Sequence, residues 1–402
     1  MNEHNPSANT NANTSAAAPS RPRGEAGGDD PASVHREAIL IDMHADTVQR
    51  MIDEGVDISG RLPDGHLDAV RARAGGLDAQ FFSIWVEPQY FGAGGERAVE
   101  RADRQIAAVR ALADARPDLW VLATSAEDVR RAAAEGKIAA LMGLEGGYAI
   151  DEKIENVRKY FDLGVRYMSP TWTVSTSWAG SSGDEAGASR GLNDFGREVV
   201  REMNRLGIIV DVSHVSDKTF WDIVETSRKP VIASHSAVRS IVPHHRNLTD
   251  DQIRALARTG GVVSVVFYPA FVEPGWNEAK ARVDAEIAAQ VNEASRGVRG
   301  TGPLRRAARD RVRTREYARR MPRVSVARIA DHVDHVVRLV GVDHVGLGSD
   351  FDGIQAVPAD LATVEDFPNL TRELLRRGYG AGDVHKILGG NILRVLEEVS
   401  RK

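Results

Sequence analysis

Apolar and polar positions follow two patterns along most of the chain. From Glu37 onward, short apolar runs rich in β-branched residues alternate with longer Ala/Glu/Arg/Leu segments of helical periodicity. The apolar runs cover residues 38–43, 77–86, 138–144, 165–169, 208–212, 230–233, 261–267 and 344–348. Runs that are apolar on both faces are typical of parallel strands covered by helices. Eight such strands predict an α/β fold, a closed (β/α)8 barrel of the TIM type, with an open doubly wound sheet as the alternative.

One long stretch interrupts this alternation after the seventh run. Residues 272–323 form a predicted helical insertion, and their second half, residues 296–323, contains eleven arginines against Asp310 and Glu316. A charge run of this kind is typical of a solvated helical face. The alternative is a lid or an anion-binding arm over the mouth of the barrel.

The first 33 residues contain almost no large apolar side chains. Such a segment cannot bury enough surface to offset its ordering entropy, so we expect a disordered tail. Residues 34–402 then form a single barrel domain. The tail also lacks the apolar core of a secretory signal, which favours the cytoplasm. No run of about 18 apolar residues exists, so we expect no membrane span.

The overall composition excludes several classes of protein. The chain has 402 residues, of which 42% are hydrophobic, enough for a large core rather than a disordered protein. It has no cysteine, which excludes disulfides, thiolate metal sites and a cysteine nucleophile. The net charge of −5 gives no reason to expect a nucleic-acid partner.

Ionisable residues gather where the predicted strands end. His44 and Asp46 follow the first run, Glu145 the third, His214 the fifth, His235 the sixth, and Asp350 the eighth. In a (β/α)8 barrel, these carboxyl ends form the catalytic face. Each residue alone has an ordinary structural explanation, such as a helix cap. Together, buried imidazoles and carboxylates would be costly to desolvate without a cation, so the pattern predicts a metal site.

The residue types indicate which metal binds there. His44 and Asp46, two positions apart, would lie on one face of a strand, about 6.6 Å apart. His214 and His235 could hold a second ion, with Glu145 bridging both. Imidazole nitrogens with carboxylate oxygens suit Zn²⁺, although other divalent metals and a single ion remain open. Two ions would supply hydroxide at neutral pH and polarise a carbonyl group.

Three further residues are candidates for work on the substrate. Asp350 is the predicted proton shuttle, with a structural acceptor as the alternative. Arg246, eleven residues after His235, could bind a substrate carboxylate, with a surface ion pair as the alternative. Tyr268 is a further candidate for substrate binding.

Six stretches of sequence carry a resemblance to a known family. They read IDMHAD, GGLDAQFFSIWV, LEGGYAI, GLNDFGREVVREMNRLGIIVDVSHVS, PVIASHSAVRSIVPHHRNL and DHVGLGSDFDGI. With them, the chain resembles the membrane (renal) dipeptidase family of zinc metallopeptidases, in the amidohydrolase-like superfamily, from about residue 39 to 398. The resemblance implies a barrel, commonly dimeric, that hydrolyses small dipeptides and tolerates a D-residue at the C-terminal position.

The resemblance also implies roles for individual residues. It makes His44 and Asp46 ligands of one zinc ion and His214 and His235 ligands of the other. It makes Glu145 the bridging carboxylate. By the same resemblance, Arg246 clamps the carboxylate of the dipeptide, and Asp350 is the catalytic acid and base.

The chain departs from the family pattern at two positions. Trp172 stands where the family has a histidine that polarises the scissile carbonyl, and Tyr148 stands where a histidine is frequent. An indole cannot bind a metal, and losing one oxyanion donor can cost about 2.7–4 kcal/mol in the transition state. Trp172 therefore becomes a candidate substrate-binding residue. The alternatives are a metal-dependent hydrolase of another small amide or ester, a catalytically weakened homologue, and a silent binding protein.

Overall fold

A parallel barrel forms the centre of the molecule. The computed structural model describes residue 1 and residues 30–401. Its strands are β1 (Leu40–Ala45), β2 (Leu77–Trp85), β3 (Trp120–Leu122), β4 (Ile138–Glu145), β5 (Val165–Ser169), β6 (Ile209–Asp211), β7 (Val231–Ser236), β8 (Val262–Val265) and β9 (Val345–Leu347). They pair in the order β1-β2-β4-β5-β6-β7-β8-β9, all parallel. The predicted (β/α)8 barrel is confirmed, and each predicted run overlaps one barrel strand.

Strand β3 was not among the strands predicted from the sequence. It has three residues and pairs with β4 outside the path of the barrel. A run this short between two helices gives no periodic signal, since alternation needs about four residues to be recognised.

The barrel closes at the end where the candidate residues lie. The backbone N–H of Asp46 donates to the carbonyl of Phe351 at 2.8 Å, and that of Asp350 donates to the carbonyl of His44 at 3.0 Å. The first and last strands are therefore joined through the segments that follow them. This closure brings Asp350 beside His44, although 306 positions separate them in the sequence.

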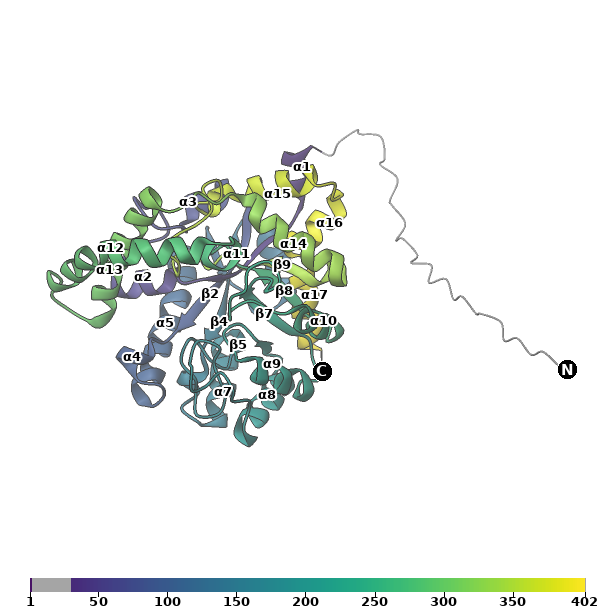
Figure 1. The fold of residues 1–402 in the computed structure, drawn as a ribbon, viewed down its shortest axis with the longest axis horizontal. Helices are drawn as coiled ribbons and strands as arrows, with labels where there is room; N and C mark the ends of the chain where they lie inside the picture. The colour runs from purple at the N-terminus through teal and green to yellow at the C-terminus, as the bar shows by residue number, and fades with distance from the viewer. Residues whose placement is uncertain (2–29, 402) are drawn as a thin grey trace.

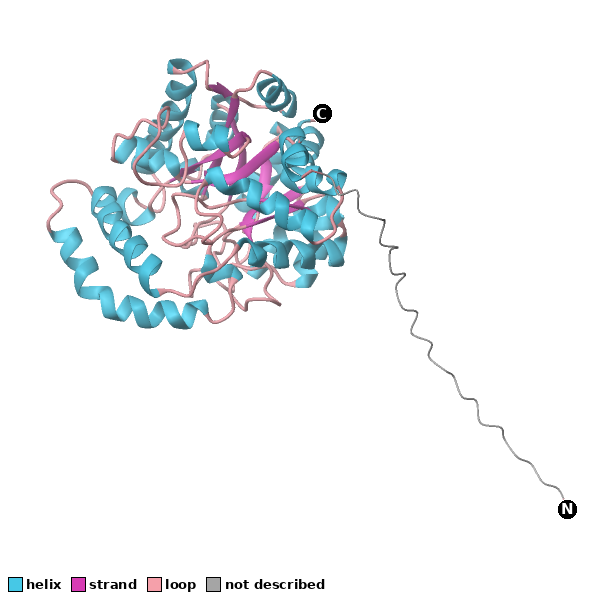
Figure 2. Ribbon diagram, turned by 90° about the horizontal axis from the view of Figure 1, so that it is seen from above, coloured by secondary structure: helices cyan, strands magenta, loops and turns pink. Residues whose placement is uncertain are grey.

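Helices surround the barrel (Figures 1 and 2). They are α1 (Pro31–Glu37), α2 (Thr47–Asp53), α3 (Ala69–Ala74), α4 (Pro88–Phe91), α5 (Glu96–Ala115), α6 (Ala126–Ala134), α7 (Ile154–Leu163), α8 (Asp194–Leu206), α9 (Asp217–Thr226), α10 (Asp250–Arg258), α11 (Pro269–Val272), α12 (Trp276–Arg296), α13 (Gly302–Arg320), α14 (Val326–Val340), α15 (Phe367–Arg376), α16 (Ala381–His385) and α17 (Asn391–Ser400). Short 3₁₀ turns lie at Gly147–Ile150, Val342–His344 and Val364–Asp366, and a π turn lies at Lys386–Gly390. Within residues 30–401, no helix is both long and apolar enough to span a bilayer.

Local signals set the ends of several helices. Helix α8 begins after Asn193, whose side chain accepts from the N–H of Gly196, and ends at Gly207, where φ is 92°. Helix α10 begins with a reciprocal capping box between Thr249 and Gln252. These side chains satisfy backbone groups that a helix end leaves without partners, and glycine adopts the left-handed conformation without strain.

Two apolar clusters explain why the strand runs are apolar on both faces. Along β2, Phe81 belongs to the cluster that includes Ile392 and Leu396 of α17, whereas Phe82 and Ile84 belong to the larger cluster. Successive strand residues point to opposite faces, so most barrel strands contribute to both clusters, whereas Val345 and Leu347 of β9 belong only to the larger one. The carboxyl ends of the strands are left to carry the polar residues.

A helical pair extends from one side of the barrel. Helices α12 and α13 pack against each other after β8, the seventh barrel strand, and are seen together in both overall views (Figures 1 and 2). Trp276, Ile287 and Tyr317 form a separate small core between them. The Arg-rich segment of the sequence is therefore a packed helix.

The boundary predicted for the N-terminal tail needs a correction. Helix α1 begins at Pro31, because the Asp30 carboxylate accepts from the N–H groups of Ala32 and Ser33 and proline suits the first helical position. Residues 31–33, assigned above to the tail, are thus helical. Residues 2–29 of the predicted tail lie outside the described residues.

Candidate metal centre and active site

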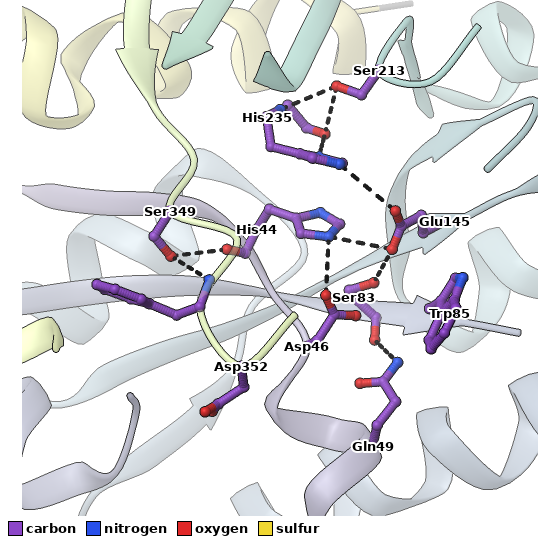
Figure 3. A network of polar contacts seen from close by, with 12 residues as sticks. His44, Asp46, Gln49, Ser83, Trp85, Glu145, Ser213, His235, Ser349 and Asp352 are labelled. Atoms are coloured by element: carbon purple, nitrogen blue, oxygen red, sulfur yellow. Dashed lines mark hydrogen bonds and ion pairs between the residues drawn. The ribbon is translucent and has the colours of Figure 1, made fainter. Parts of the chain in front are cut away.

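All five predicted metal ligands lie together at the carboxyl end of the barrel, and Figure 3 shows four of them, His44, Asp46, Glu145 and His235. His44 is in β1, Glu145 ends β4, His235 is in β7, His214 follows β6, and Asp46 follows β1. Asp350, after β9, is within 4.8 Å of both His44 and Asp46, measured between ligand atoms. The cluster is thus built from five barrel strands that are far apart in the sequence.

Glu145 faces histidines with both of its oxygens. Oε2 lies 3.3 Å from Nε2 of His44, whereas Oε1 lies 2.9 Å from Nε2 of His214 and 3.7 Å from Nε2 of His235. The hydroxyl of Ser83 donates to Oε2 at 2.8 Å. The Glu145 carboxylate therefore lies between His44 on one side and His214 with His235 on the other.

Asp46 is close to His44 for a different reason from the one predicted. Strand β1 ends at Ala45, and Asp46 is the N-cap position of α2. Strand alternation therefore does not place the two side chains on one face. The turn into the helix brings Oδ2 of Asp46 to 3.7 Å from Nε2 of His44.

Hydrogen bonds orient two of the imidazoles. Nδ1 of His44 lies 2.8 Å from the hydroxyl of Tyr167, and Nδ1 of His235 lies 2.8 Å from the hydroxyl of Ser234. Ser234 donates onward to Asp211 at 2.6 Å, so its oxygen accepts from His235 and assigns the proton to Nδ1. Nε2 of His235 is then unprotonated and lies 2.9 Å from Nε2 of His214, so both nitrogens can be ligands of one metal ion. These supports were not predicted from the sequence, although Ser234 adjoins His235 and Tyr167 lies within the fourth run.

The donor atoms fit a divalent cation. Nε2 of His44 and Oδ1 of Asp46 are buried without hydrogen-bond partners in the described part of the chain. Ligand atoms of His44, Glu145 and His235 lie within 4.8 Å of one another, as do those of His44, Asp46 and Asp350. The first group joins residues from both predicted pairs. Imidazole nitrogens and carboxylate oxygens are the ligands that catalytic zinc and similar metals use.

Burial also keeps two histidines in the form that binds metal. It lowers the pKa of His214 to about 3, and the Arg246 guanidinium adds to this effect. It lowers the pKa of His235 well below its usual value, with the neighbouring His44 and Arg246 adding to the effect. Both imidazoles are therefore neutral at pH 7, as metal coordination requires.

Asp350 has the opposite perturbation. Burial raises its pKa well above the usual value, with Asp46 and Glu145 adding to the effect and His44 opposing it. A carboxyl group with a raised pKa can hold a proton near neutral pH, which general acid and base catalysis requires.

The backbone around the cluster is strained. His214, Asp350 and Asp352 have φ values of 73°, 62° and 63°, which non-glycine residues seldom adopt. Asp352 fixes its turn by accepting from the Thr47 hydroxyl at 2.6 Å. At Gly353, a Cβ would lie 2.1 Å from Oδ2 of Asp46 and 2.5 Å from Oδ1 of Asp350, so only glycine fits.

A cavity of about 260 Å³ opens onto the cluster. Its lining residues are Asp46, Trp85, Gln89, Glu145, Trp172, His214, His235, Arg306, Asp310, Arg313, Asp350, Gly353 and Gln355. The rings of Trp85 and Trp172 lie 4.7 Å apart and form an aromatic wall. Trp172 thus lines the cavity, and its part in substrate binding stays a prediction. Tyr148, the other departure from the family pattern, lies behind this wall, where its hydroxyl accepts from the N–H of Trp172 at 3.0 Å.

The other two substrate-binding candidates lie beside the cavity rather than in its lining. Arg246 is buried, donates to the carbonyl of His235 at 3.3 Å and leaves Nη1 without a partner in the described chain. Burial lowers its pKa to about 10, so the group remains cationic. Tyr268 packs against Phe271 at 5.1 Å, and the Arg246 guanidinium lies 5.4 Å from the Phe271 ring.

The cavity lining corrects the interpretation of the Arg-rich segment. Arg306, Asp310 and Arg313 of α13 line the cavity, so this helix is more than the solvated face favoured by its charge. Arg311 and Arg319 are exposed, as expected. The sequence alone does not distinguish the arginines that face the barrel from the exposed ones, because all eleven lie in one segment.

Comparison with known proteins identifies relatives of the chain. A family model described as membrane dipeptidase (peptidase family M19) matches residues 30–402. The chain is 35% identical to dipeptidase aclJ of Aspergillus oryzae over 341 residues, which cover 83% of this chain and 70% of that protein. It is 33% identical to dipeptidase 3 of Rattus norvegicus over 345 residues, covering 84% of this chain and 59% of that protein. The match therefore spans less than two thirds of the rat protein.

Solved structures agree with these matches. The probable dipeptidase PvdM from Pseudomonas aeruginosa superposes with a TM-score of 0.78 at 27% identity, covering 92% of this chain and 97% of that one. A metallopeptidase from Rhodobacter sphaeroides, liganded with a phosphinate mimic of the dipeptide L-Ala-D-Ala, superposes with a TM-score of 0.72 at 25% identity. That superposition covers 90% of this chain and 100% of the other.

Proposed function

Because the chain belongs to the membrane dipeptidase family, peptidase family M19, we propose that it is a zinc-dependent dipeptidase with two Zn²⁺ ions. It hydrolyses the peptide bond of small dipeptides and accepts a D-residue at the C-terminal position. The observation that carries the proposal is Glu145, whose two oxygens face His44 on one side and His214 with His235 on the other. The ligand of the Rhodobacter sphaeroides relative supports the stereochemical part.

The proposed ligands divide around this carboxylate. His44 and Asp46 would hold one ion, His214 and His235 would hold the other, and Glu145 would reach both. When bound, a pair of zinc ions supplies hydroxide at neutral pH and polarises a carbonyl group. The side chains of Tyr167 and Ser234 keep two imidazoles oriented for this task.

Arg246 positions the substrate. Its buried guanidinium has an Nη1 group without a partner among the described residues, next to the backbone of His235. A carboxylate placed there would form a charge-assisted hydrogen bond and relieve the cost of a buried unpaired donor. The terminal carboxylate of a dipeptide supplies this group, which favours dipeptides over internal bonds of longer chains.

Asp350 moves the proton. Its carboxyl group, beside His44 and Asp46 in the cluster, takes a proton from the attacking water and delivers it to the nitrogen of the leaving amino acid. Its raised pKa suits both halves of this transfer.

Trp85 and Trp172 supply an apolar wall of the cavity, against which the dipeptide packs. The Trp172 indole has one N–H donor and no metal-binding atom. The comparisons do not favour the hydrolase of another amide or ester that Trp172 suggested, since the named relatives are dipeptidases.

The test combines metal analysis with a dipeptide panel. We expect about two zinc ions per chain and hydrolysis of L-Ala-L-Ala and L-Ala-D-Ala, lost on chelation and restored by zinc. Amidation of the C-terminal carboxylate should lower kcat/KM about tenfold or more in the wild type, and much less in Arg246→Gln. Absence of bound metal, or metal-loaded protein that leaves every dipeptide intact, would overturn the proposal.

A further inference from the structure

The Arg-rich helix α13 forms one wall of the active-site cavity. Arg306, Asp310 and Arg313 line the cavity together with Asp350 and Trp172. Spacings of four and three residues place the three α13 side chains on one face of the helix. None of these three side chains has a part in the metal binding or proton transfer proposed above, so they are candidates for contact with the substrate.

Contacts with β2 and with the short helix α4 hold α13 in place. The Arg306 guanidinium lies 4.8 Å from the ring of Trp85, and its Nη2 is 3.9 Å from Oε1 of the buried Glu87. Arg309 donates to the hydroxyl of Tyr90 at 3.1 Å. The wall is therefore a fixed part of the site.

The charges of the wall are unequal. The Asp310 carboxylate pairs with both arginines, at 3.0 Å from Nη1 of Arg313 and 3.5 Å from Nη1 of Arg306. Two guanidinium groups thus share one carboxylate. Nε and Nη2 of Arg313 have no hydrogen-bond partner in the part of the chain that the structure describes. Arg313 can therefore donate to an anion in the cavity while Asp310 orients it.

The charge of Arg313 acts on Tyr268, which belongs to an aromatic pair beside Arg246. Tyr268 is close enough to Arg313 for the guanidinium to lower its pKa, against burial and Asp350, which raise it. Tyr268 packs on Phe271, and Phe271 packs on the Arg246 guanidinium. With the terminal carboxylate held by Arg246, a dipeptide would direct the side chain of its C-terminal residue into the cavity that Arg313 lines.

We propose that Arg313, oriented by Asp310 and backed by Arg306, selects dipeptides whose C-terminal residue has an acidic side chain. This inference rests on the proposed function and names its substrate class. A guanidinium and a carboxylate in a partly enclosed cavity form a charge-assisted hydrogen bond that an uncharged amide cannot match.

The experiment compares substrates that differ only in charge. For the zinc-loaded wild type, kcat/KM for Ala-Glu should exceed that for the near-isosteric Ala-Gln by about tenfold, with the C-terminal residue tested in both L and D forms. In Arg313→Gln the ratio should fall to about one. Arg319→Gln is the matched control, because Arg319 is an exposed arginine of the same helix outside the cavity lining, and it should keep the wild-type ratio.

A charge reversal separates recognition from folding. Arg313→Glu should cleave Ala-Lys better than Ala-Glu, a result that mere loosening of the helix would not give. A wild-type ratio near one, or an unchanged ratio in Arg313→Gln, would overturn the inference while the dipeptidase proposal stands. If no dipeptide is cleaved at all, the proposed function fails and the inference falls with it.

Discussion

Two kinds of buried histidine occur in this molecule. His332 accepts from the N–H of Val238 at 3.0 Å through Nδ1, and its Nε2 lies 3.1 Å from the carbonyl of Val272, so both ring nitrogens are satisfied. His44 at the barrel rim is equally buried, yet its Nε2 lies 3.3 Å from Glu145 and 3.7 Å from Asp46 without a hydrogen bond in the described chain. The first histidine completes the fold by itself. The second leaves a nitrogen atom that a metal ion can bind.

The buried acids divide in the same way. Asp42 accepts from the N–H and the hydroxyl of Ser349 at 2.7 and 2.6 Å, and Asp211 accepts from Ser234 at 2.8 and 2.6 Å. Oδ1 of Asp46, in contrast, is buried without a partner in residues 30–401. Burial and charge alone therefore do not identify the site. The site is identified by buried nitrogen and oxygen atoms that lack hydrogen bonds and lie close together, because leaving such atoms unpaired is costly.

Replacing a rim histidine should give the largest effect. In His235→Ala, the cluster loses one imidazole that faces Glu145, so we expect loss of bound metal and a fall in kcat/KM of about a thousandfold or more. Elemental analysis and dipeptide kinetics measure the two effects. Normal metal content and normal activity in His235→Ala would contradict the view that the rim histidines bind metal while the hydrogen-bonded histidines are structural.

The next effect separates proton transfer from metal binding. Asp350→Asn keeps the shape of the side chain but removes its ability to take a proton, so kcat should fall by about a hundredfold or more with the metal content unchanged. The limb of the pH profile that reports this carboxyl group should disappear. A kcat within twofold of the wild type would assign the proton transfer to another group.

A smaller effect concerns the packing between the two acids. Gly353→Ala places a methyl group against Asp46 and Asp350, since the Cβ would lie 2.1 and 2.5 Å from their oxygens. A displacement of this size should lower kcat/KM by about ten- to a hundredfold. Gly382→Ala in α16 is the control, because nothing lies within 4 Å of its Cβ. Equal activity in both variants would show that the site tolerates the shift.

The sequence predicted the fold and the ligand cluster because both depend on strands. Apolar runs marked the barrel strands. The residues that follow these runs lie at the carboxyl rim of the barrel, and this does not depend on where the helices pack. Glu145 and His235 could be placed for this reason. Asp46 was also placed correctly near His44, although the turn into α2, rather than strand alternation, is the cause.

The rest of the site depends on contacts that a pattern does not encode. Ser83 and Tyr167 support the cluster across neighbouring strands, and such pairings follow from register and rotamer. Arg313 reaches the cavity because α13 docks on Trp85 and Tyr90. In the sequence it is one arginine among eleven, so its position required the structure.

The smallest effect tests the satisfied histidine. Burial lowers the pKa of His332 to about 4, against 6.5 in the unfolded chain, while its bond to the Val272 carbonyl opposes the shift. Below pH 6.5 the unfolded state takes up this proton first, so the stability from His332 is complete above that pH and is lost as the pH falls towards 4. His332→Gln should lower the free energy of unfolding by about 1–3 kcal/mol at pH 8. Urea unfolding should show that this difference narrows towards pH 4, while metal content per folded chain stays at the wild-type value. Loss of metal in His332→Gln would mean that this histidine affects the metal site. Its hydrogen bonds would then not mark it as purely structural.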